Sequence, residues 1–350
     1  MNPDPYIYLP VCFVIVLVTT YFLVPLNRSI SLKLGILDKP SPRKIHKEAT
    51  ALSGGFSFAI PILLMQLIFS YLPQGQGFSE QTRKLVIMGF ITLMIGLLDD
   101  KYVSSARFKL IYQIFLSIVM FFSGFQITTL TNPFGAEFQL GYLSFPITIF
   151  WYLLVINALN FIDGLDGLAA GITVIINLLL TVIGIMNHNP FVAFNSVILA
   201  AGAFAFLRYN FYPASIFMGD SGSMFLGLNI ASISSAGSMQ FKGITAMTML
   251  VPIIALFLPL FDIFLAVFRR LKNKTNIFKP DKAHLHHKML DLGLSQKTVA
   301  LVAYFITFLF ALIAFGFSFS TKKILFMLLI ILLVICMIIS YLLIRRENHK

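Results

Sequence analysis

The sequence predicts an all-α, polytopic integral membrane protein, and three features support that class. First, the 350-residue chain is 58% hydrophobic and only 11% charged, with a mean hydropathy of +0.88, which is too apolar for a water-soluble globule. Second, apolar runs of about 20 residues, the length a helix needs to cross a bilayer, recur along the chain. Third, Lys and Arg gather on alternate connections, as they do on the cytoplasmic side of membrane proteins.

The apolar runs predict eleven transmembrane helices. Their approximate ranges are 6–26, 52–72, 83–98, 108–126, 143–160, 168–187, 191–208, 221–239, 244–268, 298–317 and 323–344. The first run follows the segment MNPDPY, which has no positive charge, and precedes Arg28 and Lys33. This is the reverse of the charge order in a cleavable signal peptide. We therefore expect the first helix to be retained with the N-terminus outside, and an odd number of spans then puts the C-terminus in the cytoplasm.

The distribution of basic residues supports this topology, since 21 of the 26 Lys and Arg residues fall on its cytoplasmic side. The net charge of +12 reflects this bias and contact with anionic lipid or phosphate, so nucleic acid is not an expected partner. Cys12 and Cys336 both lie in apolar runs and predict neither a disulfide nor a metal site. Residues 1–350 are expected to form a single transmembrane domain. Its cytoplasmic loops lie near 27–52, 99–109, 160–168, 208–222 and 269–297.

Six carboxylates lie at or near the cytoplasmic ends of the predicted spans. They are Asp99, Asp100, Asp163, Asp166, Asp220 and Asp262. An ionisable group beside hydrocarbon is costly, so such a cluster indicates a functional site. A single Asp in this position is more often a helix cap, but six of them, accompanied by glycines and two basic loops, favour a site.

The first pair of carboxylates follows the third span in the segment IGLLDDKYV. Adjacent carboxylates such as Asp99 and Asp100 repel each other unless a cation or a proton compensates. Mg²⁺ is one such compensator, because proteins bind it through one or two carboxylates together with substrate phosphates. Lys109 opens the next span and is placed to meet a phosphate.

The most polar break between two spans is the segment NALNFIDGLDGLAAG, residues 157–171. Asn157, Asn160 and Asp163 are spaced by three, which places them on one face if the fifth helix continues that far. Gly164 and Gly167 favour a turn around Asp166. These residues predict a surface that hydrogen-bonds a polar ligand, although helix packing could also account for the two Asn residues.

Another acidic motif, Gly219-Asp220-Ser221-Gly222, opens the eighth span. The flanking glycines allow the backbone to approach a ligand closely. Asn210 and Phe217 precede the motif, and an aromatic ring at residue 217 could stack on a base. Phe217 is, however, one of 37 Phe residues, most of which must face lipid or the core.

Two basic segments are predicted on the same side of the membrane, and the second contains His284, His286 and His287 in the sequence DKAHLHHKML. Three His so close together could bind zinc. No Cys is nearby, however, and neutral imidazole ligands are disfavoured beside so many Lys residues. Hydrogen bonding to phosphate or proton transfer fits the segment better.

Acids for a metal ion, basic residues for phosphate and glycine-containing loops are together the components of phosphoryl transfer. The chain resembles the polyprenyl-phosphate N-acetylhexosamine-1-phosphate transferases of glycosyltransferase family 4. The resemblance extends over nearly the whole chain and rests on five segments in order: LDKPSPRKIHKEATALSGG, LLDDKY, NALNFIDGLDGLAAG, NFYPASIFMGDSGS and DKAHLHHKMLDLG. It implies that undecaprenyl phosphate attacks the β-phosphorus of a UDP-sugar and releases UMP, with Mg²⁺, or Mn²⁺ in its place, as cofactor.

The resemblance also implies roles for individual residues. Catalytic roles fall to Asp99, Asp100, His284, His286 and His287; metal binding to Asp220, Asp99 and Asp100; and substrate binding to Lys109, Asn157, Asn160, Asp163, Asp166, Asn210 and Phe217. The family often has a third acid after the Asp pair, where this chain has Val103, and a Pro before the Gly-Gly pair, where it has Ala51. The third acid is therefore either not used here or supplied elsewhere.

The His-containing segment resembles the branch that uses UDP-N-acetylglucosamine for teichoic acid, O-antigen or related glycans. UDP-N-acetylmuramoyl-pentapeptide and other UDP-N-acetylhexosamines are alternative donors. The expected location is the bacterial inner membrane with the active site facing the cytoplasm, and a homodimer is left open. A cation-coupled transporter is the alternative from another class, but transporters place their charges near the bilayer midplane on broken helices.

Overall fold

A computed structural model describes residues 4–38, 49–130, 138–240 and 293–316, together with 327, 328, 330–332 and 334. Its α-helices are α1 (Leu9–Leu34), α2 (Gly55–Tyr71), α3 (Ser79–Tyr102), α4 (Ala106–Phe122), α5 (Ser144–Ile162), α6 (Leu168–Met186), α7 (Pro190–Asn210), α8 (Gly219–Gln240) and α12 (Gln296–Gly316). Short 3-10 turns are η1 (Pro5–Tyr8), η2 (Pro73–Phe78) and η3 (Gly141–Leu143). Two antiparallel hairpins pair β1 (Leu37–Asp38) with β2 (Thr50–Ala51) and β3 (Thr129–Leu130) with β4 (Phe138–Gln139).

These helices confirm the predicted helical membrane class, and each coincides with one of the predicted spans. Among the described residues, five helical segments are long and apolar enough to cross a membrane: Pro5–Leu34, Gly141–Ile162, Leu168–Met186, Pro190–Asn210 and Gln296–Gly316. A sixth crossing would be the pair α2 and η2–α3, which is bent by 102°. The spans predicted at 244–268 and, for the most part, 323–344 lie outside the described residues. The total of eleven and the orientation of the termini stay predictions.

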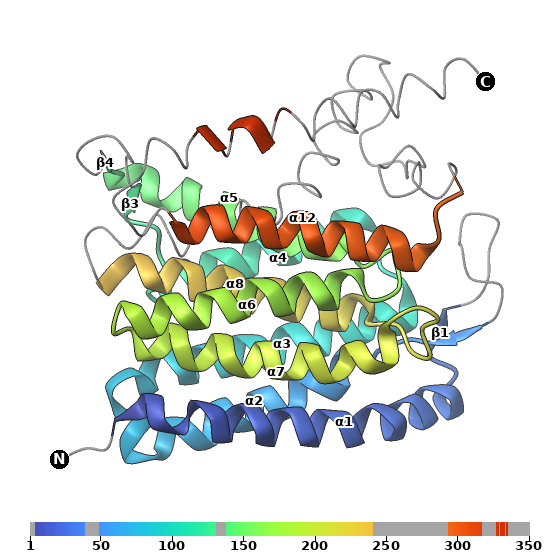
Figure 1. Cartoon of the computed structure of the whole chain (residues 1–350). Coiled ribbons are helices and arrows are strands. Elements are labelled where there is room, and N and C mark those ends of the chain that lie inside the picture. Colours follow the sequence, from blue (N-terminus) through green and yellow to red (C-terminus); the bar gives the residue numbers. More distant parts are fainter. Residues whose placement is uncertain are drawn as a thin grey trace.

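The long helices lie side by side with roughly parallel axes, from α1 at one edge to α12 at the other (Figure 1). Successive helices from α1 to α8 run in opposite directions, as short connections between neighbouring helices dictate. The ends of α1, α3, α5 and α7 therefore lie at the same end of the bundle as the starts of α2, α4, α6 and α8. The β1–β2 hairpin marks this end, which we call the hairpin end.

Helix α8 lies inside the bundle, and every residue from 221 to 236 is buried. Small residues allow its backbone to approach its neighbours, as in other membrane helix interfaces. A Cβ added to Gly55 of α2 would lie 2.2 Å from the Gly222 nitrogen, and one added to Gly96 of α3 would lie 2.4 Å from the Ser221 Cα. The start of α8 is thus pressed between α2 and α3, which fixes where Asp220 can lie.

Buried hydrogen bonds fix the rotation of α8 further along its length. Gln66 Nε2 of α2 donates to Asn195 Oδ1 of α7 at 2.9 Å and to Asn229 Oδ1 of α8 at 3.3 Å. Tyr152 of α5 donates to Ser232 Oγ at 3.1 Å. Such bonds contribute about 0.6 kcal/mol each in membrane proteins, so their main effect is to select one packing arrangement.

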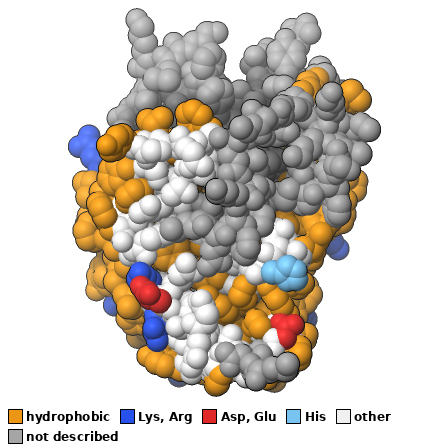
Figure 2. Space-filling model, turned by 90° about the vertical axis from the view of Figure 1, so that its left-hand side faces the viewer, with side chains coloured by type: hydrophobic (Ala, Val, Ile, Leu, Met, Phe, Trp, Pro, Cys, Tyr) orange, Lys and Arg blue, Asp and Glu red, His pale blue; other side chains and the backbone are white. Residues whose placement is uncertain are grey.

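The opposite end of the bundle has little charge among the residues that the structure describes there. Hydrophobic side chains cover the flanks seen in Figure 2, and the few charged ones include a small group in which an acidic side chain touches basic ones. They include the ion pair between Lys84 and Glu80, at 2.7 Å on the first turn and a half of α3. An apolar flank with sparse charge is what a lipid-facing bundle requires.

We expect thiol labelling to place the hairpin end in the cytoplasm, because most Lys and Arg residues are predicted on that side. In a background with Cys12 and Cys336 replaced by Ser, a cysteine at residue 80 should react with a membrane-impermeant maleimide added to intact cells. A cysteine at residue 33 should react only after the cells are opened. The reverse pattern would invert the topology.

Candidate active site

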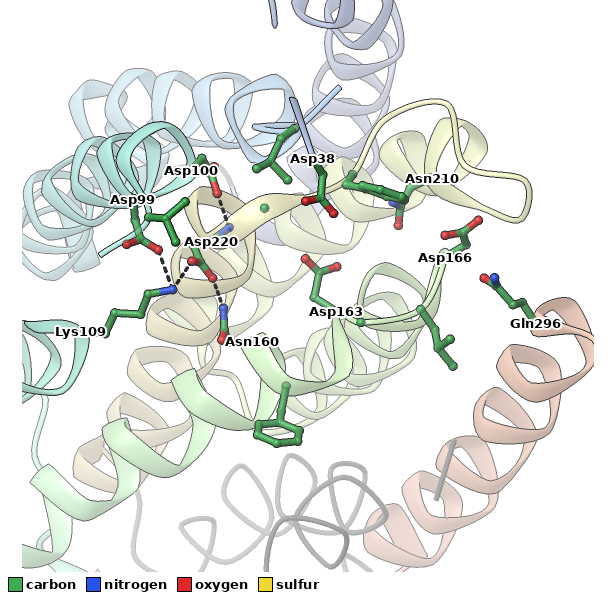
Figure 3. Close-up of a pocket in the computed structure, with 17 residues that line it drawn as sticks. Asp38, Asp99, Asp100, Lys109, Asn160, Asp163, Asp166, Asn210, Asp220 and Gln296 are labelled. Carbon is green, nitrogen blue, oxygen red and sulfur yellow. Dashed lines mark hydrogen bonds and ion pairs between the residues drawn. The ribbon is translucent and has the colours of Figure 1, made fainter. Parts of the chain in front are cut away.

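Polar side chains from several helices line a cavity of about 480 Å³ at the hairpin end of the bundle (Figure 3). The cavity brings together most of the residues that the sequence singles out: Asp99, Asp100, Lys109, Asn160, Asp163, Asp166, Asn210, Phe217 and Asp220. Asn157 does not line it. His284, His286, His287 and Asp262 lie outside the described residues. Segments more than one hundred residues apart in the sequence therefore meet at one site.

The centre of the cavity is a cluster of two carboxylates and one ammonium group. The Lys109 Nζ of α4 lies 2.6 Å from Asp99 Oδ2 of α3, and it also pairs with Asp220 Oδ2 of α8. Asp99 is only 5% exposed, and its Oδ1 accepts a hydrogen bond from the Ser104 nitrogen at 2.7 Å. Because the cluster is shielded from bulk water, its charges interact more strongly than surface ion pairs do.

Helix α5 supplies a fourth member of the cluster. The Asn160 Nδ2 donates to Asp220 Oδ1 and, at 3.0 Å, to Ser223 Oγ. Lys109 and Asn160 therefore each hold one of the two oxygens of the Asp220 carboxylate (Figure 3). This fixes the orientation of the carboxylate without any need for substrate.

Asp100 has a different structural role from its neighbour Asp99. Its Oδ1 accepts from the Asp220 nitrogen at 2.7 Å, and its Oδ2 accepts from the Ser221 nitrogen at 3.3 Å and the Ser221 Oγ at 2.6 Å. The first N–H groups of a helix have no partner inside it and carry the positive end of its dipole. Gly219, with φ +75°, permits this approach, since a Cβ there would lie 2.6 Å from the Asp100 carboxylate. Asp100 thus caps α8 from α3.

We expect Asp100→Asn to lower the stability of the protein, because an amide turns an NH₂ group toward backbone donors. Loss of a hydrogen bond to a charged acceptor costs about 2 kcal/mol. Thermal unfolding of the purified protein would measure the effect. Glu80→Gln, in the exposed ion pair with Lys84 on the first turns of α3, is the matched control and should leave the unfolding temperature nearly unchanged, because exposed pairs contribute little. Equal unfolding temperatures for Asp100→Asn and the parent protein would contradict the capping role.

Asp163 follows the last residue of α5 and lines the cavity beside the cluster. Burial raises the pKa of its carboxyl group well above the usual range, and the negative charges of Asp220 and Asp100 raise that pKa further. A cation placed nearby would have the opposite effect and favour the ionised form. Asp163 therefore marks a part of the cavity that is suited to added positive charge.

Asp166 and Asn210 hold the loop that joins α7 to α8, residues 211–218. Asp166 Oδ2 accepts from the Ala214 nitrogen at 2.9 Å. Asn210 Oδ1 accepts from the Gly167 nitrogen at 3.1 Å, and its Nδ2 donates to the Ile216 oxygen at 3.0 Å. Both polar atoms of the buried Asn210 amide are thus used to tie the 211–218 loop to the start of α6.

The same loop is tied to the β1–β2 hairpin through Phe217. The Phe217 nitrogen donates to the Ala51 oxygen at 2.8 Å, and its oxygen accepts from the Gly54 nitrogen at 2.8 Å. Phe217 lines the cavity, as the base-stacking prediction requires. Ala51, where the family often has Pro, therefore acts here through its backbone.

Asn157 lies outside the cavity and serves another purpose. Its Nδ2 donates to Gln113 Oε1 at 2.7 Å and to the Leu153 oxygen at 2.7 Å. Gln113 is one helical turn beyond Lys109 on α4, and Asn157 is one turn before Asn160 on α5. The Gln113–Asn157 bond therefore fixes the spacing of the two helices that hold Asp220.

The cavity also contains residues that the sequence did not single out as site residues, namely Asp38 of β1 and Gln296 at the start of α12. Asp38 lies in a segment rich in Lys and Arg, so its carboxylate did not stand out as a site residue. A single Gln after a loop, such as Gln296, does not indicate a site. Val103, at the position of the third acid, ends α3 with φ +52° and is 82% exposed. Val103 lines the cavity but has no carboxylate, so it cannot replace the third acid.

The donor set suits a hard divalent cation. Asp99 Oδ2 and Asp220 Oδ2 come from different helices, yet both are aimed at one cationic centre, the Lys109 ammonium. Within the described ranges, no group of three or more His, Cys, Asp or Glu side chains could hold a metal ion by itself. Mg²⁺ does not need such a group, because it keeps several waters and uses one or two carboxylates with substrate phosphates.

Comparison with known proteins identifies the kind of site. A model described as glycosyl transferase family 4 matches residues 83–238, which run from α3 to α8. A Bacillus subtilis (strain 168) protein named "Probable undecaprenyl-phosphate N-acetylglucosaminyl 1-phosphate transferase" is 37% identical over 317 residues, which cover 90% of this chain and 86% of that protein. The chain belongs to glycosyl transferase family 4. It is an enzyme of sugar-phosphate transfer in the polyprenyl-phosphate N-acetylhexosamine-1-phosphate transferase branch.

Two further relatives show the range of this family 4 branch. The "Decaprenyl-phosphate N-acetylglucosaminephosphotransferase" of Mycobacterium tuberculosis (strain CDC 1551 / Oshkosh) is 32% identical over 310 residues, 82% of this chain and 77% of that protein. The "Phospho-N-acetylmuramoyl-pentapeptide-transferase" of Clostridium botulinum (strain Alaska E43 / Type E3) is 30% identical over 240 residues, 67% of this chain and 74% of that protein. The family resemblance read from the sequence motifs is thereby confirmed.

For this family 4 transferase, we expect Gln113→Leu to lower kcat about tenfold with little change in KM, since small displacements of catalytic groups cost about that much or more. The exchanged pair Gln113→Asn with Asn157→Gln should recover most of the loss by restoring the bond between α4 and α5. Ser117→Ala, one turn further along α4, is the control. A loss that the exchanged pair does not recover would exclude the positioning role.

Proposed function

We propose that this transferase moves N-acetylglucosamine 1-phosphate from UDP-N-acetylglucosamine to undecaprenyl phosphate and releases UMP. The product would start a lipid-linked cell-envelope glycan such as teichoic acid or O-antigen. The observation that carries the proposal is the convergence of Asp99, Lys109 and Asp220 in one cavity of a chain related over 90% of its length to a protein with that name.

The choice of donor rests on the relatives. The Bacillus and Mycobacterium proteins are named for N-acetylglucosamine, and they match more of this chain than the Clostridium protein named for N-acetylmuramoyl-pentapeptide. We therefore favour UDP-N-acetylglucosamine. UDP-N-acetylmuramoyl-pentapeptide and other UDP-N-acetylhexosamines are the alternatives.

In the proposed reaction, an oxygen of the lipid phosphate forms a bond to the β-phosphorus of the UDP-sugar. The bond from that phosphorus to the bridging oxygen of UMP breaks, and UMP leaves with the electron pair. The acceptor phosphate is already largely ionised at neutral pH, because its second pKa is about 6. Asp99 therefore does not need to act as a strong base, and positioning with charge neutralisation should supply most of the rate.

Each cavity residue has a task in this scheme. Asp99 and Asp220 would hold Mg²⁺, or Mn²⁺, which when bound neutralises charge on the diphosphate. Lys109, released from one of its carboxylates, would meet a phosphate oxygen. The UDP moiety is assigned to Asp163 and Phe217, and Asn210 positions the loop that carries Phe217. Asp100 acts by holding α8 rather than as a ligand of the reacting atoms. The catalytic role of His284, His286 and His287 stays as predicted from the sequence.

The site is proposed to face the cytoplasm from the inner membrane of a bacterial cell, where both a soluble UDP-sugar and a lipid acceptor are accessible. The bilayer then supplies the acceptor lipid, undecaprenyl phosphate. A cation-coupled transporter is the competing class. The carboxylates gather at one end of the bundle instead of its middle, which is unlike the midplane sites of such transporters.

The proposal can be tested with purified protein in lipid nanodiscs containing undecaprenyl phosphate. Labelled UDP-N-acetylglucosamine should yield an extractable labelled lipid with release of UMP. Chelation of divalent cations should abolish the reaction, and added Mg²⁺ should restore it. A product from only another UDP-sugar would change the donor. Uptake of label into sealed vesicles without a lipid product would favour the transporter and overturn the proposal.

A further inference from the structure

A second cavity, of about 720 Å³, lies between α1 and the last turns of α7, and we call it the aromatic groove. The 211–218 loop separates it from the site cavity. Phe211, Tyr212 and Pro213 of this loop line the aromatic groove, whereas Phe217 lines the site cavity. None of the reaction steps above uses the aromatic groove.

The lining of the aromatic groove is apolar and aromatic. Leu17 and Tyr21 form its α1 wall, and Phe204 and Leu207 belong to its α7 wall. The rings of Tyr21 and Tyr209 lie 5.4 Å apart, and the side chains of Tyr21 and Phe204 are about half exposed. Tyr side chains are enriched at the boundary between hydrocarbon and headgroups.

Positive charge borders this apolar lining. Arg208 lines the groove, and Arg28 reaches its rim, where its Nε donates to the Ser215 oxygen at 3.0 Å. No Asp or Glu lines the groove, and in the described part of the chain Arg208 forms no ion pair. Asp166 accepts a hydrogen bond from the Ala214 nitrogen of the 211–218 loop, but it lines the site cavity and not the aromatic groove. The groove therefore combines hydrocarbon contacts with a guanidinium charge that no carboxylate of the described residues pairs.

A ligand for such a groove must have an anionic head and a hydrocarbon tail. The outer face of α1 is itself apolar and exposed, with Val14, Val18 and Phe22 each more than 40% accessible, so an acyl chain could lie along it. We propose that the aromatic groove binds an anionic phospholipid of the surrounding membrane, with its phosphate at Arg208 and a chain against Leu17 and Phe204.

The lipid substrate is a different candidate with similar chemistry, but the geometry favours a phospholipid. An acceptor phosphate must reach Lys109 and Asp220, which line the site cavity on the other side of the 211–218 loop. The 211–218 loop lies between a phosphate bound at Arg208 and the Lys109 ammonium group. The bound phospholipid would instead support the loop from its outer side.

Native mass spectrometry of the full-length protein, titrated with dioleoyl-phosphatidylglycerol or dioleoyl-phosphatidylcholine, tests the proposal without any measurement of activity. Arg208→Gln should weaken phosphatidylglycerol binding about fivefold, the effect of one basic side chain near anionic lipid, and leave phosphatidylcholine unchanged. Arg208→Lys should retain most of the binding. Lys33→Gln removes one positive charge from the last turn of α1, at the same end of the bundle but outside the groove, and is the matched control.

Leu17→Trp, which fills the groove from α1, should also weaken phosphatidylglycerol binding, so the test does not depend on one variant. Unchanged binding in both Arg208→Gln and Leu17→Trp would overturn the proposal, as would an equal loss in Lys33→Gln. In a parallel titration with undecaprenyl phosphate, a selective loss of its binding in Arg208→Gln would make the groove an acceptor site. Loss of a dimer in that variant would make it a contact between two copies of the chain, and either result would overturn the phospholipid assignment.

Discussion

Asp220→Asn is expected to lower turnover about a thousandfold while the protein stays folded. The Asp220 carboxylate joins Lys109 of α4 to Asn160 of α5 and faces Asp99 across the ammonium group. An amide keeps the shape but removes the negative charge that a divalent cation requires. Loss of one preorganised electrostatic group in a closed site costs a factor of about 10² to 10³ in rate, and loss of metal affinity adds to it.

Two measurements separate this effect from a folding defect. Electron paramagnetic resonance of added Mn²⁺ should show bound metal in the parent protein and much less in Asp220→Asn, independently of substrate. Asp38→Asn changes the same functional group in the same cavity, away from Lys109, and should bind Mn²⁺ normally. Normal rates in Asp220→Asn would remove this residue from the reaction, and normal Mn²⁺ binding would remove it from the metal site.

Lys109→Gln is expected to lower turnover at least about a hundredfold, because it removes the positive charge proposed to meet the substrate phosphate. The variant should also show a second, distinctive property. Without the ammonium group, Asp99 and Asp220 repel each other until another cation compensates. Added Mg²⁺ should therefore raise the unfolding temperature of Lys109→Gln more than that of the parent protein, since a ligand stabilises the state it binds.

Lys101→Gln is the matched control for this variant, since Lys101 lies near the end of α3 but does not line the cavity. Its turnover and its response to Mg²⁺ should equal those of the parent protein. An equal Mg²⁺ response in Lys109→Gln and the parent protein would exclude Lys109 as the internal counter-ion of Asp99 and Asp220. A normal rate in Lys109→Gln would exclude it as a phosphate contact.

Much of the site could be predicted from sequence because charged residues are rare in membrane helices. Against apolar surroundings, Asp99, Asp163 and Asp220 stand out without any structural information, and their motifs are specific to the family. The prediction was least informative where a polar residue has a structural partner. Asn157 has the spacing of a ligand-binding residue, but its amide bonds Gln113, and spacing along one helix cannot reveal a partner on another.

The sequence by itself determined the membrane class, the approximate ranges of the nine α-helices that the structure describes, and the family, because hydropathy and motif order are local properties of the chain. Only the tertiary structure decided how adjacent carboxylates divide their tasks. Neighbouring residues on a helix point about 100° apart, so Asp100 faces the N-terminus of α8 while Asp99 faces Lys109. Which partner stands in each direction depends on how α3, α4 and α8 pack, and that packing is set by contacts distant in sequence.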